Sequence, residues 1–211
     1  MKPTLALITI LLSAGCMAEK IPQLASQVPQ LASQIQPLRV GDTVPDVTLH
    51  TAEDTHFALR EEVMTQPTVI IFYRGGWCPY CNRHLSALQT IEQQLLEMGF
   101  QILAISPDRP EKLRETAEKD NLTYQLLSDS SMEAARAFGI AFQLDDTTVK
   151  KYKEEYKIDI EADSGQTHHQ LPVPAVFIAD VEGKIIFGHT NPDYKVRLTP
   201  EAIITVARML N

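Results

Sequence analysis

The stretch that decides the fold is "PTVIIFYRGGWCPYCNRHL", residues 67–85, in which an apolar run leads through two glycines to two cysteines. The run is rich in β-branched and aromatic residues and carries no charge before Arg74, which is typical of a strand buried on both faces. The pair Cys78 and Cys81 directly follows it. Three interpretations of the pair are open: a redox centre, two metal ligands or a chance pairing.

The segments after the cysteines predict a helix and a second buried strand. Leu85, Leu88, Ile91, Leu95 and Leu96 fall on one side of a helix that Gly99 ends. The run "FQILAISPD", residues 100–108, has the composition of a buried strand. Strand, helix and strand together predict a right-handed βαβ unit with a parallel pair.

Weaker patterns complete the domain. We expect a small hairpin at 47–49 and around Phe57, a helical turn at 59–66, a surface helix at 110–120 and a short strand at 124–129. Residues 131–139 predict a helix capped by Ser130 or Ser131. Two antiparallel strands at 173–180 and 181–190, joined by a turn at Gly183, precede a last helix at 200–210.

Residues 140–171 interrupt this order. The part at 147–157 is charged and the part at 159–170 is polar and loop-like, so we expect an insertion on the outside of the fold. The whole order predicts an α/β fold that resembles thioredoxin: a mixed central sheet flanked by helices, with an N-terminal hairpin and an insertion near 140–171.

Bulk properties agree with one catalytic domain at residues 38–211. A chain of 211 residues is long enough to bury a sizeable core without stabilising disulfides or metals. Its 19 Lys and Arg stand against 27 Asp and Glu, for a formal charge of −8, and no basic stripe with interleaved aromatic residues occurs. We therefore expect no nucleic-acid partner.

The N-terminus predicts export. Residues 5–12 form an apolar stretch too short to span a bilayer but right for a signal peptide. The sequence "LSAGC", residues 12–16, resembles the lipobox of bacterial lipoproteins, although Ser13 stands where Leu is most common. We expect residues 1–15 to be a lipoprotein-type signal peptide with a lipid anchor on Cys16, or residues 1–18 to be removed without lipidation. Both predict the bacterial cell envelope or periplasm.

Residues 16–37 predict a tether between membrane and domain. Within them the unit "PQLASQ" occurs twice, with apolar residues at alternating three and four spacing. Pro29 lies inside this pattern and disfavours a continuous helix. A dimerising or membrane-lying helix is the alternative interpretation.

The place of the two cysteines at the start of the predicted helix indicates why they are reactive. Pro79 suits the first position of a helix, which makes Cys78 the N-cap residue. There the orphan N–H groups and the helix dipole favour an anion, so the pKa of Cys78 is expected to fall below that of a free thiol. Cys81, one turn further on, lies within reach of a disulfide and is more shielded. A disulfide that closes so small a loop stabilises the fold little and is better suited to serve as a redox couple.

Neighbouring residues are assigned from their place in the same stretch. Arg74 is expected to add positive charge beside the pair, whereas Arg83 and His84 are expected to face solvent. Trp77, the only tryptophan in the chain, is expected to shield the site and to offer an apolar surface to a partner; a core aromatic is the alternative.

A metal site needs further ligands. Two cysteines supply half of a tetrahedral zinc site, and the nearest candidates are His168 and His169, far along the chain in a polar loop. We expect no metal and no cofactor other than a redox-active Cys78–Cys81 disulfide.

Residues 40–207 resemble the alkyl hydroperoxide reductase and thiol-specific antioxidant (AhpC/TSA) family, the peroxiredoxins, within the thioredoxin superfamily. The resemblance lies in "GDTVPD" (41–46), "TVIIFYRGGWCPYC" (68–81), "ILAISPD" (102–108), "LLSD" (126–129) and "VPAVFIADVEGKI" (173–185). It implies that a cysteine of this chain reduces a peroxide substrate and is thereby oxidised. A thiol electron donor then reduces the oxidised cysteine.

The active-site residues resemble two patterns at once. In the peroxiredoxin register Arg74 stands at the family's Pro, Cys78 at its Thr, Cys81 at its peroxidatic Cys and Pro174 at its strand Arg. Thioredoxins instead have Trp-Cys-x-x-Cys and a distant proline, usually cis, which Trp77, Cys78, Cys81 and Pro174 match. The capping argument and the thioredoxin match make Cys78 the attacking sulfur, and the peroxiredoxin register makes it Cys81.

The favoured interpretation is an oxidoreductase that reduces peroxides through a Cys78/Cys81 dithiol–disulfide cycle. A thioredoxin-like enzyme acting on protein disulfides is the first alternative. A thiol protein that binds copper or zinc is the second.

Overall fold

The computed structural model describes residues 28–210, so the predicted signal peptide, Cys16 and most of the predicted tether lie outside the described residues. Its strands are β1 (Thr48–Thr51), β2 (His56–Ala58), β3 (Thr68–Phe72), β4 (Gln101–Ser106), β5 (Gln125–Ser128), β6 (Ala141–Gln143), β7 (Gln170–Pro172), β8 (Ala175–Ala179) and β9 (Ile185–Thr190). Its helices are α1 (Leu59–Val63), α2 (Pro79–Gln89), α3 (Glu92–Glu97), α4 (Pro110–Asp120), α5 (Glu133–Ala137), α6 (Asp146–Glu154), α7 (Ile160–Ser164) and α8 (Pro200–Leu210), with a short 3-10 helix at Ala32–Gln34.

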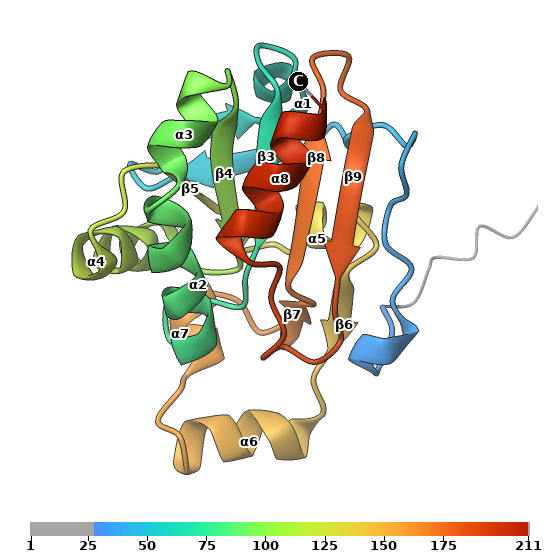
Figure 1. Ribbon diagram of the computed structural model, residues 1–211. Coiled ribbons are helices and arrows are strands. Elements are labelled where there is room, and N and C mark those ends of the chain that lie inside the picture. The colour runs from blue at the N-terminus through green and yellow to red at the C-terminus, as the bar shows by residue number, and fades with distance from the viewer. Residues whose placement is uncertain (1–27, 211) are drawn as a thin grey trace, which may run out of the picture.

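A mixed sheet forms the centre of the molecule (Figure 1). Its strand order is β2-β1-β5-β4-β3-β8-β9. Strand β4 is parallel to both β3 and β5, whereas β8 is antiparallel to β3 and β9. The predicted βαβ unit, the hairpin β1–β2 and the antiparallel pair β8–β9 are therefore confirmed, and with them the α/β class and the thioredoxin-like arrangement.

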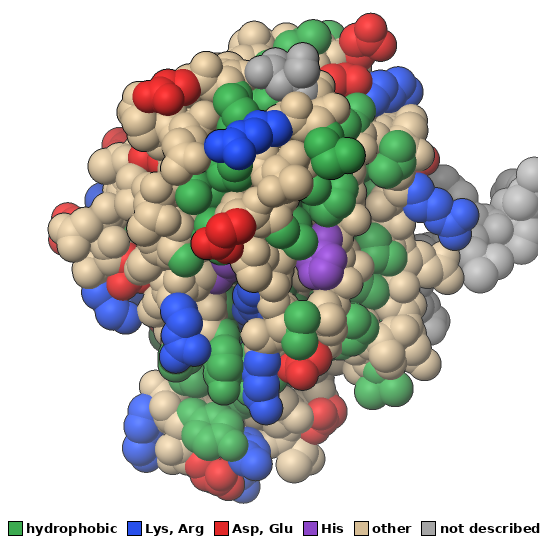
Figure 2. Space-filling model, in the orientation of Figure 1, with side chains coloured by type: hydrophobic (Ala, Val, Ile, Leu, Met, Phe, Trp, Pro, Cys, Tyr) green, Lys and Arg blue, Asp and Glu red, His purple; other side chains and the backbone are tan. Residues whose placement is uncertain are grey.

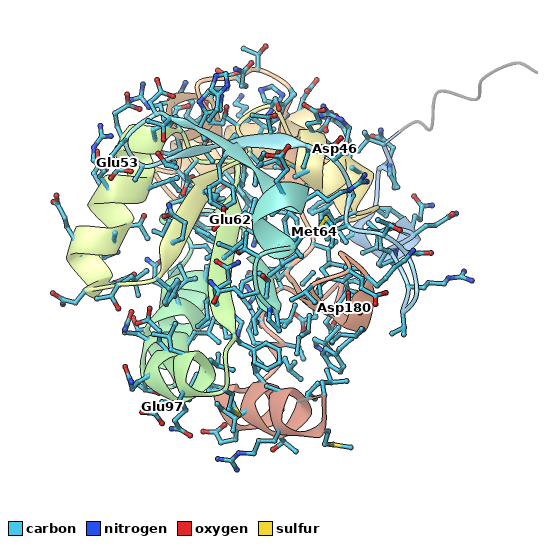
Figure 3. The ribbon with its side chains drawn as sticks, turned by 90° about the horizontal axis from the view of Figure 1, so that it is seen from above. Asp46, Glu53, Glu62, Met64, Glu97 and Asp180 are labelled. Carbon is cyan, nitrogen blue, oxygen red and sulfur yellow. The ribbon has the colours of Figure 1, made fainter. Side chains whose placement is uncertain are left out.

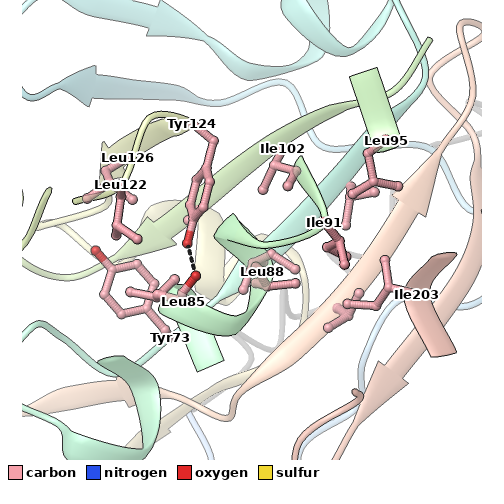
Figure 4. Packing of buried hydrophobic residues seen from close by; sticks show 14 of the residues in the cluster. Tyr73, Leu85, Leu88, Ile91, Leu95, Ile102, Leu122, Tyr124, Leu126 and Ile203 are labelled. Carbon is pink, nitrogen blue, oxygen red and sulfur yellow. Dashed lines mark hydrogen bonds between the residues drawn. The ribbon is translucent and has the colours of Figure 1, made fainter. Parts of the chain in front are cut away.

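Helices cover both faces of this sheet because successive strand residues point to opposite sides. In β3, Val69 and Ile71 pack with α2, α3, α4 and α8. Ile70 and Phe72 pack on the other side with α1 and α5. Figure 4 shows the first of these layers, in which the Tyr124 hydroxyl also donates a hydrogen bond of 2.9 Å to the carbonyl of Leu85 at the start of the apolar face of α2.

The helix predicted after the cysteines is two helices. The break falls at Thr90, whose backbone N–H and hydroxyl both bond to the carbonyl of Ala87, at 3.2 and 2.7 Å. Ile91 likewise bonds to Leu88 three residues back. The chain tightens at this point into 3-10 geometry, while the apolar periodicity continues because Ile91 and Leu95 remain buried.

The predicted cap of the helix near residue 131 is wrong. Neither Ser130 nor Ser131 caps α5, whose N-cap residue is Met132 in left-handed conformation. The carboxylate of Asp129 instead accepts the N–H groups of Ala134 and Ala135, at 3.0 and 2.8 Å. An Asp reaching across from the end of β5 satisfies two orphan donors at once.

Part of the predicted tether is packed on the domain. The carbonyl of Pro29 accepts the N–H of Gln143 on β6, and the N–H of Gln36 bonds to the carbonyl of Gly139, at 2.8 and 3.1 Å. A Cβ at position 139 would lie 2.0 Å from the carbonyl oxygen of Gln36, so this approach requires glycine. The domain therefore includes residues 28–37.

The predicted insertion at 140–171 has regular structure of its own. Strands β6 and β7 form a small antiparallel sheet, and helices α6 and α7 lie between them in sequence. The segment expected to be a polar loop at 159–170 contains α7, whose start is capped by the Asp159 carboxylate. Within residues 28–210, no helix has the length and apolar character needed to cross a membrane.

Candidate active site

The loop between β3 and α2 is held in one conformation by its two glycines. Gly75 adopts φ +140°, and a Cβ there would lie 2.3 Å from the indole nitrogen of Trp77. A Cβ on Gly76 would lie 1.9 Å from the hydroxyl oxygen of Thr116 on α4. The buried carboxylate of Asp108 accepts the N–H of Gly76 at 2.7 Å. Close packing and one buried hydrogen bond thus fix where the next residues start the helix.

Cys78 is the N-cap residue of α2, with Pro79 in the first turn, as the sequence predicts. Its carbonyl accepts the N–H groups of Cys81 and Asn82, both at 3.0 Å. Both cysteines are free thiols and both are buried, with Cys78 1 % and Cys81 0 % exposed. The geometry therefore places one sulfur at the positive end of the helix and the other one turn inside the core.

The two sulfurs differ in acidity in the direction the capping argument predicts. A hydrogen bond from the Cys81 thiol is the main cause that lowers the pKa of Cys78 to about 6, and the Cys81 N–H and the charges of Arg74 and Arg197 act in the same direction against burial. Burial raises the pKa of Cys81 well above the usual range of a thiol. At neutral pH Cys78 is the thiolate and Cys81 the thiol.

Arg74 lies beside the pair, inside a cage of aromatic rings. Its guanidinium carbon is 5.1 Å from the ring centre of Trp77, 5.7 Å from that of Tyr152 and 4.3 Å from that of Tyr194. It also donates a hydrogen bond to the Tyr152 hydroxyl. Arg74 itself is only 4 % exposed. The predicted positive charge is present, and it is buried.

A second guanidinium, from Arg197, reaches the other sulfur. Its Nη2 lies 3.5 Å from the Sγ of Cys81. Arg197 belongs to the irregular segment between β9 and α8, which runs back toward α2 (Figure 1). That segment is attached to α2 by His84, whose Nε2 donates to the carbonyl of Leu198 at 3.0 Å. Two arginines from distant parts of the chain therefore flank the dithiol.

The prediction that His84 faces solvent is wrong. His84 is 8 % exposed because residues 191–199 fold over its side of α2. Burial and the charge of Arg197 lower the pKa of His84 to about 4, so its imidazole is neutral at pH 7. Arg83 does face solvent, as expected, and lies over the ring of Tyr80.

The insertion lies on the outside of the fold, as expected, and it also covers the site (Figure 1). Tyr152 of α6 makes an edge contact with Trp77, with ring centres 5.8 Å apart, in addition to its bond with Arg74. Trp77 and Tyr152 also pack on the apolar cluster of Leu144, Ile160 and Leu171 within the insertion. Figure 2 shows hydrophobic and basic side chains together where the α6 lobe meets the rest of the molecule. Trp77 is half-buried between the dithiol and this lobe.

Pro174 lies near Arg74 but does not reproduce the thioredoxin pattern in full. It immediately precedes β8, whose Ala175 pairs with Phe72, and it shares a cavity with Arg74. No cis peptide bond occurs in the described part of the chain, so the bond before Pro174 is trans.

The histidines considered as metal ligands have other partners. The Nε2 of His168 is 2.8 Å from the carbonyl of Ser130, to which it donates, and the Nε2 of His169 is 2.7 Å from the carboxylate of Glu161. In residues 28–210 no three His, Cys, Asp or Glu side chains come together as a metal site would require.

Sequence reasoning missed four residues at the site: Asp108, Tyr152, Tyr194 and Arg197. Asp108 ends the run "ILAISPD", where a carboxylate after a buried strand was the available signal. The tyrosines and Arg197 lie in segments with weak periodicity, so no pattern placed them at the dithiol. Their position depends on tertiary packing of the insertion and of residues 191–199.

A thioredoxin fold with a Cys-x-x-Cys pair at the start of its second helix defines a thiol protein of the thioredoxin superfamily. The AhpC/TSA family matches residues 40–187, and the chain belongs to this family.

Individual relatives are peroxiredoxins. The chain is 33 % identical over 104 residues to a putative peroxiredoxin Bcp of Haemophilus influenzae and 32 % identical over 104 residues to peroxiredoxin Bcp of Escherichia coli K12. Each match covers 49 % of this chain and 66 % of the relative. A putative peroxiredoxin of Mycobacterium tuberculosis H37Rv is 26 % identical over 154 residues, which are 73 % of this chain and 86 % of the relative.

Solved structures agree on the fold. The peroxidoxin BcpB of Mycobacterium tuberculosis superposes with a TM-score of 0.64 at 20 % identity, covering 82 % of this chain and 99 % of the other. Peroxiredoxin Q of Xanthomonas campestris gives 0.61 at 18 % identity, covering 82 % and 96 %.

Proposed function

We propose that the protein is a thiol peroxidase that reduces peroxides through a dithiol–disulfide cycle of Cys78 and Cys81, with Cys78 as the nucleophile. Family membership and the peroxiredoxin relatives support the reaction class. The observation that carries the assignment of the sulfur is the position of Cys78 as the N-cap of α2, with its pKa lowered to about 6 beside a protonated Cys81.

The proposed cycle has three steps. The Cys78 thiolate attacks one oxygen of the peroxide ROOH, the O–O bond breaks, and the departing RO⁻ takes a proton to leave as ROH, so Cys78 becomes a sulfenic acid. The Cys81 sulfur then attacks the Cys78 sulfur, a disulfide forms, and the hydroxyl leaves as water with the Cys81 proton. An external dithiol reduces this disulfide by exchange and is itself oxidised.

Arg74 and Arg197 fit these steps. Both place positive charge at a sulfur that must carry negative charge during attack. The peroxiredoxin pattern has an arginine on a later strand, and Pro174 occupies that position in this chain. Neither Arg74 nor Arg197 therefore corresponds to the family's arginine. The cage around Arg74 and the cover formed by α6 keep bulk water from the dithiol, which strengthens the effect of each charge.

Stopped-flow fluorescence of Trp77 tests the proposal, because Trp77 is the only tryptophan and precedes Cys78 directly. The reduced protein, Cys78→Ser and Cys81→Ser are each mixed with hydrogen peroxide and with cumene hydroperoxide. We expect a fast phase in wild type and in Cys81→Ser and none in Cys78→Ser. A rate no faster than that of a free thiol in all three proteins would refute peroxidase activity.

Thiol–disulfide exchange on protein disulfides is the second candidate. It is favoured by one specific observation: the low-pKa sulfur is Cys78, the first of the Cys-x-x-Cys pair, and not Cys81 in the peroxiredoxin register. Reduction of insulin disulfides by the pre-reduced protein separates the two activities. Fast insulin reduction without a fast peroxide phase would assign exchange.

The location is also a proposal. The apolar residues 5–12 and the lipobox-like "LSAGC" support export to the bacterial cell envelope with a lipid anchor on Cys16. Mass spectrometry of the protein extracted from Escherichia coli membranes, beside Cys16→Ser, tests this. A diacylglyceryl mass on a chain that begins at residue 16 is expected, and a chain that begins at residue 19 would contradict lipidation.

A further inference from the structure

A cavity of about 290 Å³ opens at Arg74, whose charge also acts on Cys78. Its walls come from the N-terminal segment, the insertion and the chain before β8. They combine apolar side chains, such as those of Leu144, Val173 and Pro174, with polar ones that include Arg74, Tyr152 and Tyr194. We call this space the Arg74 cavity. Its volume lies near the lower limit of the range for sites that bind small molecules.

Arg74 has no carboxylate partner in the described part of the chain, although its charge also acts on the Cys78 thiolate. No carboxylate there lies within 4.0 Å of it, and its Nε is fully buried without a hydrogen-bond partner. Its polar contact is the hydroxyl of Tyr152. The carboxylate that lines the cavity, Asp145, uses its two oxygens for the N–H and hydroxyl of Thr148, at 2.8 and 2.7 Å.

A buried guanidinium in this state favours an anion. Burial of a charge without a carboxylate in contact costs free energy, which three aromatic rings offset only in part. The guanidinium presents its donors as a flat fork that matches a carboxylate with two parallel hydrogen bonds. The apolar walls of the cavity suit a hydrocarbon body attached to that carboxylate.

We infer that the Arg74 cavity binds a small organic acid, with its carboxylate on Arg74 and its apolar body against the walls formed by Leu144, Val173 and Pro174. The acid is a reactant at Cys78, which rests on the proposed function. It enters either as the oxidant, a hydroperoxide that carries a carboxylate, or as the reductant, a thiol that carries one. Both share the chemistry that Arg74 and the cavity recognise.

Binding is tested with octanoate and its neutral counterpart octanamide. The reduced protein, without peroxide, is titrated with each while Trp77 fluorescence is recorded, because Trp77 lies 5.1 Å from the guanidinium. Octanoate is expected to bind at least about tenfold more tightly than octanamide. Equal binding, or no binding of either, would overturn the inference. A protein that binds octanoate but does not reduce peroxides would refute only the proposed function.

Variants locate the site. Arg74→Gln is expected to remove the preference for octanoate, whereas Arg83→Gln, which changes an exposed arginine on α2, is expected to keep it. Should Arg74→Gln fail to fold, Ala32→Trp tests the cavity itself, because it fills the space from the N-terminal segment without changing the core. Unchanged octanoate binding in Ala32→Trp would overturn the inference.

Two further arms identify the reactant. In the oxidant arm, the 4-carboxy derivative of cumene hydroperoxide is compared with cumene hydroperoxide on the reduced protein. In the reductant arm, 3-mercaptopropionate is compared with 2-mercaptoethanol on the disulfide form. If the acid is preferred in one arm and the preference depends on Arg74, that arm shows whether the acid is the oxidant or the reductant. No preference in either arm would refute the cavity as a substrate site.

Discussion

The guanidinium of Arg197 lies 3.5 Å from the sulfur of Cys81, although 116 positions separate the two residues in the chain. The contact exists because residues 191–199 return to α2 after β9, where His84 bonds to Leu198. In the peroxiredoxin register the arginine of the later strand is replaced by Pro174. Arg197 places a positive charge at the dithiol from a segment other than that strand.

Arg197→Gln is expected to slow formation of the disulfide more than the first attack on peroxide. Cys81 has a raised pKa and must lose its proton to attack the sulfenic acid, and Arg197 is the charge that opposes this rise. We expect the second phase of Trp77 fluorescence after peroxide to slow by about tenfold, with partial recovery in Arg197→Lys. Arg208→Gln, on the exposed side of α8, serves as the matched control. Equal slowing of both phases would contradict this role.

Removal of the Cys81 thiol is expected to raise the pKa of Cys78. The hydrogen bond from Cys81 is the largest cause of its low value, about 6. In Cys81→Ala the thiolate fraction at pH 7 should therefore fall by about tenfold or more. In Cys81→Ser, whose hydroxyl also donates, it should fall less.

The measurement for this pair is the rate of Cys78 alkylation by iodoacetamide between pH 4 and 10, read by mass spectrometry. The wild-type rate should rise through a midpoint near pH 6. An unchanged midpoint in Cys81→Ala would show that the helix terminus and the arginines alone set the acidity.

The sequence predicted what depends on local pattern. The buried strand before Arg74, the N-cap at Cys78 and the antiparallel pair β8–β9 follow from composition, proline placement and turn residues, and the structure contains all three. These features involve residues near one another in the chain, so a single sequence contains the information for them.

What the sequence did not predict depends on segments that meet only in the fold. His84 has a polar side chain on α2, and its burial follows from residues 191–199, which carry no periodic pattern. Tyr152 lies on a charged helix whose own residues include none that is fully buried, so its contact with Trp77 left no apolar signature. The sequence of residues 140–171 therefore predicts an outer insertion but not the contact of α6 with the site.

Gly76→Ala is expected to destabilise the domain by a steric effect alone. The new Cβ would lie 1.9 Å from the hydroxyl oxygen of Thr116 and 3.2 Å from its Cβ, with no strained φ at this position. We expect a loss of about 1–3 kcal/mol in the free energy of unfolding by urea. The double variant Gly76→Ala/Thr116→Ala should recover most of the loss relative to Thr116→Ala, because the clashing oxygen is gone. Additive losses would place the cause elsewhere in the loop.

Asp108→Asn is expected to change how stability depends on pH. Burial raises the pKa of Asp108 to about 7, so between about pH 4 and 7 the folded protein keeps a proton that the unfolded chain has released. Stability from this group is complete below pH 4 and is lost as the pH rises to 7, by at most about 4 kcal/mol. Asn stays neutral and its amide oxygen still accepts the N–H of Gly76, so Asp108→Asn should lose less stability than wild type between pH 5 and 8. Urea unfolding at pH 5 and at pH 8 measures the difference, with Asp46→Asn, which changes an exposed aspartate labelled in Figure 3, as the control. A decline in Asp108→Asn equal to that of wild type would show that Asp108 is ionised in the folded protein throughout this range.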